Sequence, residues 1–447
     1  MTSTPQSPEV PDPQPASATH PCAGQSGVAV RLNRYCHCVT VDRARLGTGL
    51  GLDNGSLALA PLPATHPHLF SDSAVFVESA QLACMQRLVS AIETVVALPG
   101  WQAQAIARAG VPAAVATRDA TAARGMFLGY DFHLGANGPQ LIEINTNAGG
   151  MLLNTLLRSA QVACCEEVGD ALRGRSADAV ADDIVTMFRH EWQRARGGSP
   201  MGTIAIVDDE PRAQFLYPEF ERFVALLKAH GMTAVIADAA ALVVRDDALW
   251  FREQRIDFVY NRLTDFLLTG PHHAALAEAW QRGLALVSPH PRAWALYADK
   301  RNLVTLTDAP ALRALGVEED TIAILLAGIP RTVLLSAENA QQLWTERRQW
   351  FFKPAAGYAS KAAYRGDKLT RGKWEEILAA GGYIAQALVP PSERHLLVDG
   401  EERPLKIDVR NYVYDGRVQL VSARLYQGQT TNLRTPGGGF APVFAVG

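Results

Sequence analysis

Apolar residues recur at a spacing of three and four positions after residue 72. They are Val75, Leu82, Met85, Leu88, Val89, Ile92 and Val96. This spacing predicts one amphipathic helix that opens at Asp72-Ser73-Ala74 and ends at Pro99-Gly100. Residues 28–70 carry many Gly and Pro without a period, and we expect them to be irregular. Further helices are predicted around 151–171 and within 173–198.

Between residues 203 and 262 the pattern changes to strand–helix–strand. Short apolar runs at 203–208, 231–238 and 256–262 are typical of buried strands, and residues 219–230 have the pattern of an amphipathic helix. This alternation predicts a small parallel α/β lobe with right-handed crossovers. The lobe has no Gly-x-Gly-x-x-Gly segment, so we do not expect a dinucleotide site there.

Strand patterns dominate after residue 288. A turn leads into a helix at 288–302, and strands are predicted at 350–353, 383–389, 404–414 and 417–425, with a helix near 371–380. Asp415-Gly416 is a hairpin turn between the last two strands. The chain is therefore predicted to be an α/β protein with four parts: a leader (1–27), an N-terminal part (28–200), the small lobe (201–287) and a C-terminal part (288–447).

Three polar residues of another predicted hairpin carry the strongest chemical signal. Glu143 and Asn145 are two positions apart on a strand and so share a face, and the turn Ala136-Asn137-Gly138 would set Asp131 opposite Glu143. Carboxylate and carboxamide oxygens suit Mg²⁺ bound beside phosphate. Polar residues on the open face of a hairpin are also common without any ligand. The Asn-Thr-Asn-Ala-Gly-Gly run at 145–150 favours the functional alternative, because its backbone N–H groups could meet an anion.

Composition narrows the class of protein. The 447 residues are 48% hydrophobic and 19% charged, with a formal charge of −3, as in soluble globular proteins of two or three packed units. A nucleic-acid or membrane-surface partner normally needs a basic field, so neither is expected. Residues 1–27 are predicted to be a disordered leader rather than a signal peptide. Six cysteines form no disulfide framework, which favours a reducing cytoplasm. Cys36-His37-Cys38 lacks a second ligand pair, so buried thiols are favoured over a metal site.

A second group of residues is cationic. Lys353 ends a strand and precedes a small-residue loop that contains Gly357, Ser360 and Lys361, a type of loop that can lie over a triphosphate. An ordinary surface loop with scattered lysines and no ligand would have the same sequence pattern. The strand residues Arg410 and Arg424, with Asn432, Arg434 and the glycines 437–439, could bind carboxylate or phosphate.

These residues together resemble the ATP-grasp superfamily, specifically the circularly permuted branch typified by eukaryotic-type glutathione synthetase. The similarity covers roughly residues 115–447. In most ATP-grasp enzymes the acidic strands follow the nucleotide loops, whereas here Asp131, Glu143 and Asn145 precede them. The resemblance implies an ATP-grasp fold, with residues 201–287 as the lobe that precedes it in other members.

The resemblance also implies roles for single residues. Glu143 and Asn145 would bind Mg²⁺, and Lys300 and Lys353 would hold ATP phosphates. Residues 383–389 look like the hinge that meets adenine, with Gln386 and Leu388 nearest. The acyl-phosphate and substrate contacts would come from the cationic C-terminal strands and the small lobe: Arg410, Arg424, Asn432 and Arg262.

One departure from the family leaves the metal shell open. The glutathione synthetase loop carries a metal-binding glutamate, but Ala355-Ala356-Gly357 has no acid here. The third metal ligand is then Asp131 or Asp408. The same departure weakens the inference that glutathione is the product. The implied activity is ATP-dependent ligation of a small-molecule carboxylate to an amine, and Arg262 and the 434–439 loop suggest an anionic substrate. A regulatory ATP-binding protein and a small-molecule kinase are the alternatives, and a homodimer is the default expectation.

Overall fold

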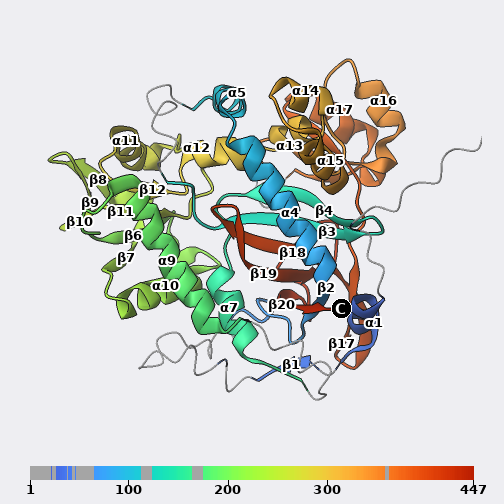
Figure 1. Cartoon of the computed structure of the whole chain (residues 1–447), viewed down its shortest axis with the longest axis horizontal. Coiled ribbons are helices and arrows are strands. Elements are labelled where there is room, and N and C mark those ends of the chain that lie inside the picture. The colour runs from blue at the N-terminus through green and yellow to red at the C-terminus, as the bar shows by residue number, and fades with distance from the viewer. Residues whose placement is uncertain are drawn as a thin grey trace, which may run out of the picture.

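A large central sheet separates a small α/β lobe from a second, smaller sheet with its own helices (Figure 1). The computed structural model describes residues 22, 27–37, 39–42, 46, 65–111, 123–163, 175–357 and 362–447. Most of the predicted leader therefore lies outside the described residues. The mixed α/β class is as predicted.

The central sheet unites strands from both ends of the chain. Its order is β2-β20-β19-β18-β3-β4, antiparallel except for the β2–β20 pair, and β17 pairs with another part of β18. The strands are β2 (Val75–Glu78), β3 (Leu128–Gly135), β4 (Gly138–Asn145), β17 (Glu393–Val398), β18 (Glu401–Tyr414), β19 (Arg417–Tyr426) and β20 (Gly439–Val446). The acidic hairpin β3–β4 thus lies beside the arginine-bearing strands although more than 250 residues separate them.

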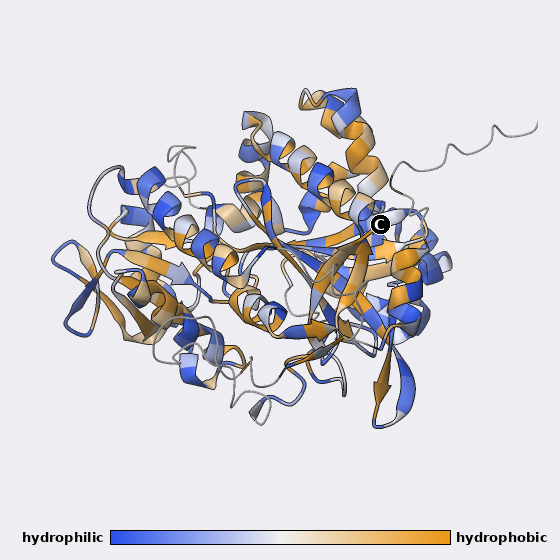
Figure 2. Cartoon of the chain, turned by 60° about the horizontal axis from the view of Figure 1, so that its bottom comes forward, coloured by the Kyte–Doolittle hydropathy of each residue, from blue (hydrophilic) through white to orange (hydrophobic). Residues whose placement is uncertain are grey.

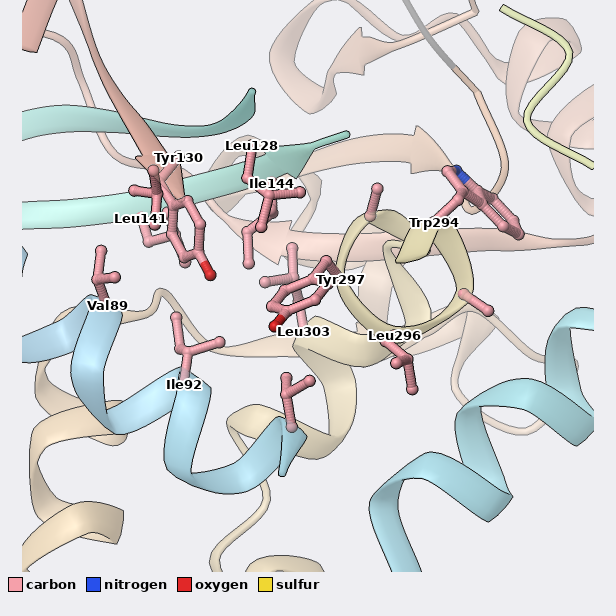
Figure 3. Packing of buried hydrophobic residues seen from close by; sticks show 14 of the residues in the cluster. Val89, Ile92, Leu128, Tyr130, Leu141, Ile144, Trp294, Leu296, Tyr297 and Leu303 are labelled. Carbon is pink, nitrogen blue, oxygen red and sulfur yellow. The ribbon is translucent and has the colours of Figure 1, made fainter. Parts of the chain in front are cut away.

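One face of this sheet is covered by the long helix α4 (Ser79–Val96). Val89 and Ile92 of α4 point toward Tyr130 and Ile144 of the hairpin, as Figure 3 shows. Because side chains alternate along a strand, the residues between these apolar positions face the other way. The opposite face receives α7 (Met151–Ser159), which packs on β20. Figure 2 shows hydrophobic residues concentrated along the central strands and polar residues on outlying loops.

The small lobe contains the predicted parallel strands. They run in the order β12-β11-β6-β7, with β6 (Ile204–Asp208), β7 (Ala234–Asp238), β11 (Phe258–Asn261) and β12 (Leu286–Ser288). Its helices are α9 (Ala177–Arg196), α10 (Tyr217–Ala229) and α11 (Ala274–Arg282), with short turns η1 (Pro211–Ala213), η2 (Ala239–Ala241) and η3 (Pro271–His273). An antiparallel sheet of β8 (Leu242–Arg245), β9 (Ala248–Phe251) and β10 (Gln254–Ile256) was not predicted.

The second sheet has the order β13-β16-β14-β15 and its own apolar core around Phe352 and Trp374. Its strands are β13 (Thr332–Leu334), β14 (Trp350–Pro354), β15 (Tyr364–Arg365) and β16 (Tyr383–Ala387). The helices and turns of this part are α12 (Pro291–Ala293), η4 (Trp294–Ala298), α13 (Arg301–Leu306), α14 (Ala309–Ala314), α15 (Glu319–Gly328), α16 (Ala340–Thr345), η5 (Arg347–Gln349), η6 (Gly366–Lys368) and α17 (Arg371–Ala380).

The predicted helix over 72–99 is wrong at both ends. Residues 75–78 form β2, whose side chains are all buried, so a continuous apolar run there belongs to a strand and not to a helix. Pro99 is the first residue of the next helix, α5 (Pro99–Ala109), a position that suits proline. The helix predicted over 151–171 is also too long, because α7 ends at Ser159 and β5 (Gln161–Ala163) follows.

The N-terminal segment is more regular than predicted. Residues 28–35 form helix α1 (Val28–Tyr35), and β1 (Val39–Val41) pairs with β5. Cys22 and Cys84 form a disulfide, which the sequence did not lead us to expect, so neither of these two cysteines is a free thiol. Cys36 is buried and Cys38 lies outside the described residues.

In the described ranges no single helix is long and apolar enough to cross a membrane. Helices α4 and α5 are long and apolar enough only when they are taken together, and they meet at an angle of 82°.

A buried arginine fastens α1 to the sheet. The Arg394 side chain is fully buried, and its guanidinium donates to the backbone oxygens of Ala74, Asn33 and Cys36 and to the hydroxyl of Ser73. Burial lowers the pKa of Arg394 to about 10. We expect Arg394→Ala to lower the free energy of unfolding by about 3–5 kcal/mol, because it leaves several buried carbonyls without donors. Urea unfolding measures this change.

The matched control is Arg403→Ala. Within the described part of the chain Arg403 pairs with Glu401 alone, on the exposed part of β18, so its loss should cost less than about 1 kcal/mol. Equal losses in the two variants would contradict the anchoring role of Arg394.

Candidate functional site

Polar side chains from four neighbouring strands gather on the sheet face that α4 leaves uncovered. Asp131 of β3 lies opposite Glu143 of β4 on one side and opposite Arg410 of β18 on the other. Asp408, two positions before Arg410, lies opposite Arg424 of β19. The predicted pairing of Asp131 with Glu143 is confirmed, and so is the Asp415-Gly416 turn that brings the arginine strands together.

The hairpin reaches this register in a different way from the one predicted. Its loop has two residues, not three, since Gly135 pairs with Gly138, which has a φ of 90° that favours glycine. A two-residue loop alone would place Asp131 opposite Ile142. The register shifts between Asp131 and Phe132, so Ile142 is an extra, bulged residue and Glu143 takes its place.

Asp131 is the centre of a buried ion cluster. Arg410 donates to both of its carboxylate oxygens, each at 2.6 Å, and Arg424 donates to Oδ2 at 2.8 Å. Burial by itself would raise the pKa of Asp131, but the two arginines outweigh it and hold the pKa at about 2. Arg424 also donates to Asp408 at 2.6 Å. The cluster therefore ties three adjacent strands through side chains as well as through backbone pairing.

Glu143 and Asn145 stand next to this cluster and next to a lysine. Asn145 donates its side-chain amide to Asp131 at 3.0 Å and to Glu143 at 3.1 Å. The ammonium of Lys300 lies 3.8 Å from Glu143 Oε2 and donates to the backbone oxygen of Gly357. Burial acts to raise the pKa of Glu143, but Lys300 and Lys353 bring it below the usual value. Glu143 is thus a carboxylate facing two cations.

Lys353 enters the same space from the second sheet. Its ammonium donates to the side chain of Gln386 on β16 and to the backbone oxygen of Ile142, both at 2.9 Å. The bulge is what leaves this oxygen of Ile142 outside the regular ladder. Burial lowers the pKa of Lys353 to about 8, against the opposing effect of Glu143. An anion entering here would meet a lysine that is held by neutral acceptors only.

These groups surround one cavity between the two sheets. Most of the predicted site residues line it: Glu143, Asn145, Lys300, Lys353, Gly357, Gln386, Leu388, Arg410 and Arg424. The end of β16 and the residues after it, Ala387 to Val389, form an apolar wall together with Ile142 and Phe351. The lining of the cavity is therefore partly charged, with both cationic and acidic groups, and partly apolar.

The donor set fits a hard cation, with Glu143 and Asn145 as its protein ligands. Asp131 is fully buried, and its carboxylate already accepts from Arg410, Arg424 and Asn145, which disfavours it as a metal ligand. Asp408 differs, since its buried Oδ1 accepts no hydrogen bond within the described chain and the residue lines the cavity. Among the described residues no three His, Cys, Asp or Glu side chains are grouped to hold a metal alone. A cation here would need oxygens from a bound ligand.

Three predicted residues lie elsewhere. Arg262 is buried in the small lobe, where it donates to the backbone oxygen of Asn147 and to the hydroxyl of Tyr260. Asn432 braces its own loop through the carbonyl of Gln427 and the backbone N–H of Arg434, which is exposed. Neither Arg262 nor Arg434 lines the cavity, so the anionic substrate that these two residues suggested stays a prediction. Ser360 and Lys361 lie outside the described residues.

Sequence reasoning missed His133, which also lines the cavity. Its Nδ1 is 2.7 Å from the backbone oxygen of Val389, next to the predicted hinge. Burial lowers the pKa of His133, against the effect of Asp408, so the ring is neutral near pH 7. Its position two residues after Asp131 places it on the same face, and that spacing was the available signal. Thr431 was missed as well; its hydroxyl donates to Asp408 at 2.6 Å.

Known structures resemble this fold. A glutathione synthetase-like effector of Globodera pallida matches with a TM-score of 0.53 and 12% identity, over 84% of this chain and 90% of that one. A provisionally assigned γ-glutamylcysteine synthetase of Methylobacillus flagellatus matches with a TM-score of 0.45 and 12% identity, over 81% and 86% of the two chains. D-cycloserine synthetase DcsG matches over 51% of this chain and 76% of its own, with a TM-score of 0.29 and 19% identity.

The first of these likenesses shows the fold alone: the chain has the fold of a glutathione synthetase-like protein, as its sequence predicts. No protein-family profile and no characterised protein matches the sequence. The permuted order of the chain relative to other ATP-grasp proteins stays a prediction.

The contribution of the ion cluster to the free energy of unfolding can be measured. Asp131→Asn leaves two buried guanidinium groups without their shared counterion, and we expect it to lower the free energy of unfolding by about 3–5 kcal/mol. The folded-state pKa of Asp131 lies below its ordinary value of 3.8, so the carboxylate stabilises the fold above that pH. This stabilisation is lost as the pH falls from about 4 toward about 2. Urea unfolding across that range should show a smaller pH dependence in the variant.

The control is Asp183→Asn, which removes an exposed pair with Arg175 and should cost less than about 1 kcal/mol. An unfolding curve of Asp131→Asn that matches the unchanged protein would refute the central role of the cluster.

Proposed function

We propose that the protein is an ATP-dependent ligase that joins a small-molecule carboxylate to an amine through an acyl phosphate. The observation that carries the proposal is the cavity in which Lys300 and Lys353 face Glu143 and Asn145. The two lysines come from different parts of the chain, are both buried and share the carboxylate of Glu143, so a further anion would be stabilised between them. The likeness of the fold to a glutathione synthetase-like protein supports the same reading.

The cavity also suits the shape of a nucleotide. The apolar wall formed by Ile142, Phe351 and Leu388 is appropriate for a purine ring, and the polar end is appropriate for phosphates. Lys300 and Lys353 would neutralise the phosphate oxygens. Glu143 and Asn145 would hold Mg²⁺, which when bound would supply further neutralisation of the phosphate charge.

The reaction needs positioning more than it needs a protein nucleophile. In the first step an oxygen of the substrate carboxylate attacks the γ-phosphorus and ADP leaves. In the second, the amine attacks the acyl carbon, phosphate leaves and the amine loses a proton. Arg410 and Arg424 line the cavity beside Asp131, where their charge would stabilise the developing oxyanions. Asn432 would act indirectly, because its side chain braces the loop that carries Thr431.

Enzyme assays separate this proposal from its alternatives. Purified protein would be screened with pairs of carboxylates and amines for ADP release, with mass detection of the product. Transfer of ¹⁸O from a labelled carboxylate into phosphate is expected, since only ligation moves that oxygen. ADP release without this transfer would indicate a kinase, and nucleotide binding without turnover would indicate a regulatory protein. Both results would overturn the ligase.

The metal ligand gives the first specific prediction. We expect Glu143→Ala to abolish substrate-dependent ADP release, because it removes the one carboxylate in the cavity that is free of an arginine. The side chain is partly exposed to the cavity, so the fold should persist and circular dichroism should be unchanged. Residual turnover close to that of the unchanged protein would remove Glu143 from the mechanism. Gln140→Ala, on the same strand outside the cavity, is the control.

Lys353 gives a prediction about pH. Its ammonium is charged below a pKa of about 8 and neutral above it, so nucleotide affinity should fall as the pH rises through 8. Calorimetry with ADP between pH 6.5 and 9.5 would show a loss of about tenfold or more at the alkaline end, the equivalent of about 1.4 kcal/mol. Lys353→Ala should bind weakly at every pH. Lys353→Arg keeps its charge throughout, so its affinity should not follow this curve. Identical pH profiles for Lys353→Arg and the unchanged protein would exclude Lys353 as the titrating group.

A further inference from the structure

The two candidate metal ligands stand on a strand with little support. Glu143 and Asn145 belong to β4, which is the last strand of the central sheet and pairs, among the described strands, with β3 alone. The bulge at Ile142 interrupts even this pairing just before Glu143. Backbone pairing therefore fixes the end of β4 weakly, and another contact is needed to hold it within the tolerance that a metal site requires.

The small lobe provides that contact directly after Asn145. Arg262, at the end of β11, donates from Nη1 to the backbone oxygen of Asn147 at 3.3 Å. In the other direction, the side-chain amide of Asn147 donates to the backbone oxygen of Leu263 at 2.6 Å. This reciprocal pair joins the exit of β4 to the exit of a parallel strand in the lobe.

A glutamate of the lobe holds the next residues. Both carboxylate oxygens of Glu219, on α10, accept the backbone N–H of Gly150, at 2.9 and 3.0 Å, and Oε1 also accepts the N–H of Leu152 at 3.2 Å. Gly150 has a φ of 97°, and a side chain there would collide with the ring of Phe440. Of the run 145–150 that the sequence offered to an external anion, the last N–H group, that of Gly150, thus donates to a carboxylate of the protein itself.

Arg262 and Glu219 support each other. The Arg262 guanidinium lies 5.5 Å from the ring centres of Phe220 and Tyr260 and is nine-tenths buried. Burial raises the pKa of Glu219, and Arg262 opposes this effect. A Cβ on Gly149 would lie 2.5 Å from Nη2 of Arg262, so the segment passes directly over the guanidinium. The arginine is enclosed by the chain that it holds and has no open face toward a substrate.

We propose that Glu219 and Arg262 are positioning residues for Glu143 and Asn145, and that the small lobe sets the geometry of the metal site by clamping residues 147–150. The proposal rests on the function proposed above. Tyr412, whose hydroxyl donates to the backbone oxygen of Gly149 at 2.8 Å, completes the clamp from the central sheet. Arg262 thereby serves the metal site and not the binding of an anionic substrate.

The experiment measures metal affinity apart from turnover. Mn²⁺ binding in the presence of ATP would be followed by electron paramagnetic resonance in the unchanged protein, Glu219→Gln and Arg262→Lys. Glu219→Gln keeps the shape of the side chain but loses its charge and one acceptor. Loss of groups that orient metal ligands typically weakens metal affinity by about 10–100-fold, and we expect at least about tenfold here. Hydrogen exchange at residues 147–152 should accelerate in the same variants without metal.

Glu191→Gln is the matched control. Glu191 is as buried as Glu219 and also accepts two backbone N–H groups, those of Arg124 and Gly125, and its other hydrogen-bond partners in the described chain are the hydroxyls of Ser288 and Tyr414. Both glutamine variants should lose thermal stability, and only Glu219→Gln should lose Mn²⁺ affinity. If Glu219→Gln does not fold, Glu219→Asp and Arg262→Lys carry the test.

Two failures are distinguishable. Absence of ATP-dependent Mn²⁺ binding in the unchanged protein would overturn the proposed function. The second failure is normal Mn²⁺ binding in the unchanged protein and equal affinity in Glu219→Gln, or in both Glu219→Asp and Arg262→Lys if Glu219→Gln does not fold. This result would leave the proposed function intact and overturn the clamp.

Discussion

The pairing of Asp131 with Arg410 and Arg424 is the interaction on which the rest of the site depends. It fills the centre of the sheet face with charge, which is tolerable only because each group is neutralised by its neighbours across the strands. It also fixes the lateral order β19-β18-β3, since each strand contributes one member. With Asp131 committed to the arginines, the neighbouring Glu143 is left facing the cavity and its lysines.

A single sheet thus performs two tasks on its two faces. Tyr130 and Ile144 pack under α4 in the apolar core, while Asp131, Glu143 and Asn145, on the alternate positions, build the polar face. The rigid packing of the first face determines where the side chains of the second face stand. The second sheet then closes the cavity by bringing Lys353 and Gln386 against it.

Much of this arrangement could be predicted from the sequence, and the exceptions have physical causes. The acidic hairpin, the parallel lobe and the arginine hairpin are local patterns with a clear period and a recognisable turn. The helix predicted from residue 72 was wrong because β2 pairs with β20, more than 360 residues later, and no local pattern contains that partner. The same limit applies to Arg262 and Asn432: their residue types suggested ligand contacts, and only the fold reveals that both hydrogen-bond to neighbouring backbone outside the cavity. His133 was missed because one histidine on a strand has many ordinary explanations.

The bulged residue Ile142 has a consequence for variation in the length of the chain. It converts the two-residue turn at Ala136-Asn137 into the register that sets Glu143 opposite Asp131, and its carbonyl receives Lys353. Removing any one residue between 138 and 142 would absorb the bulge into a regular hairpin in which Glu143 still lies opposite Asp131, but the displaced carbonyl that Lys353 contacts would be lost. Homologous chains with one residue fewer in this segment should therefore keep the acidic pair and hold the lysine through another acceptor.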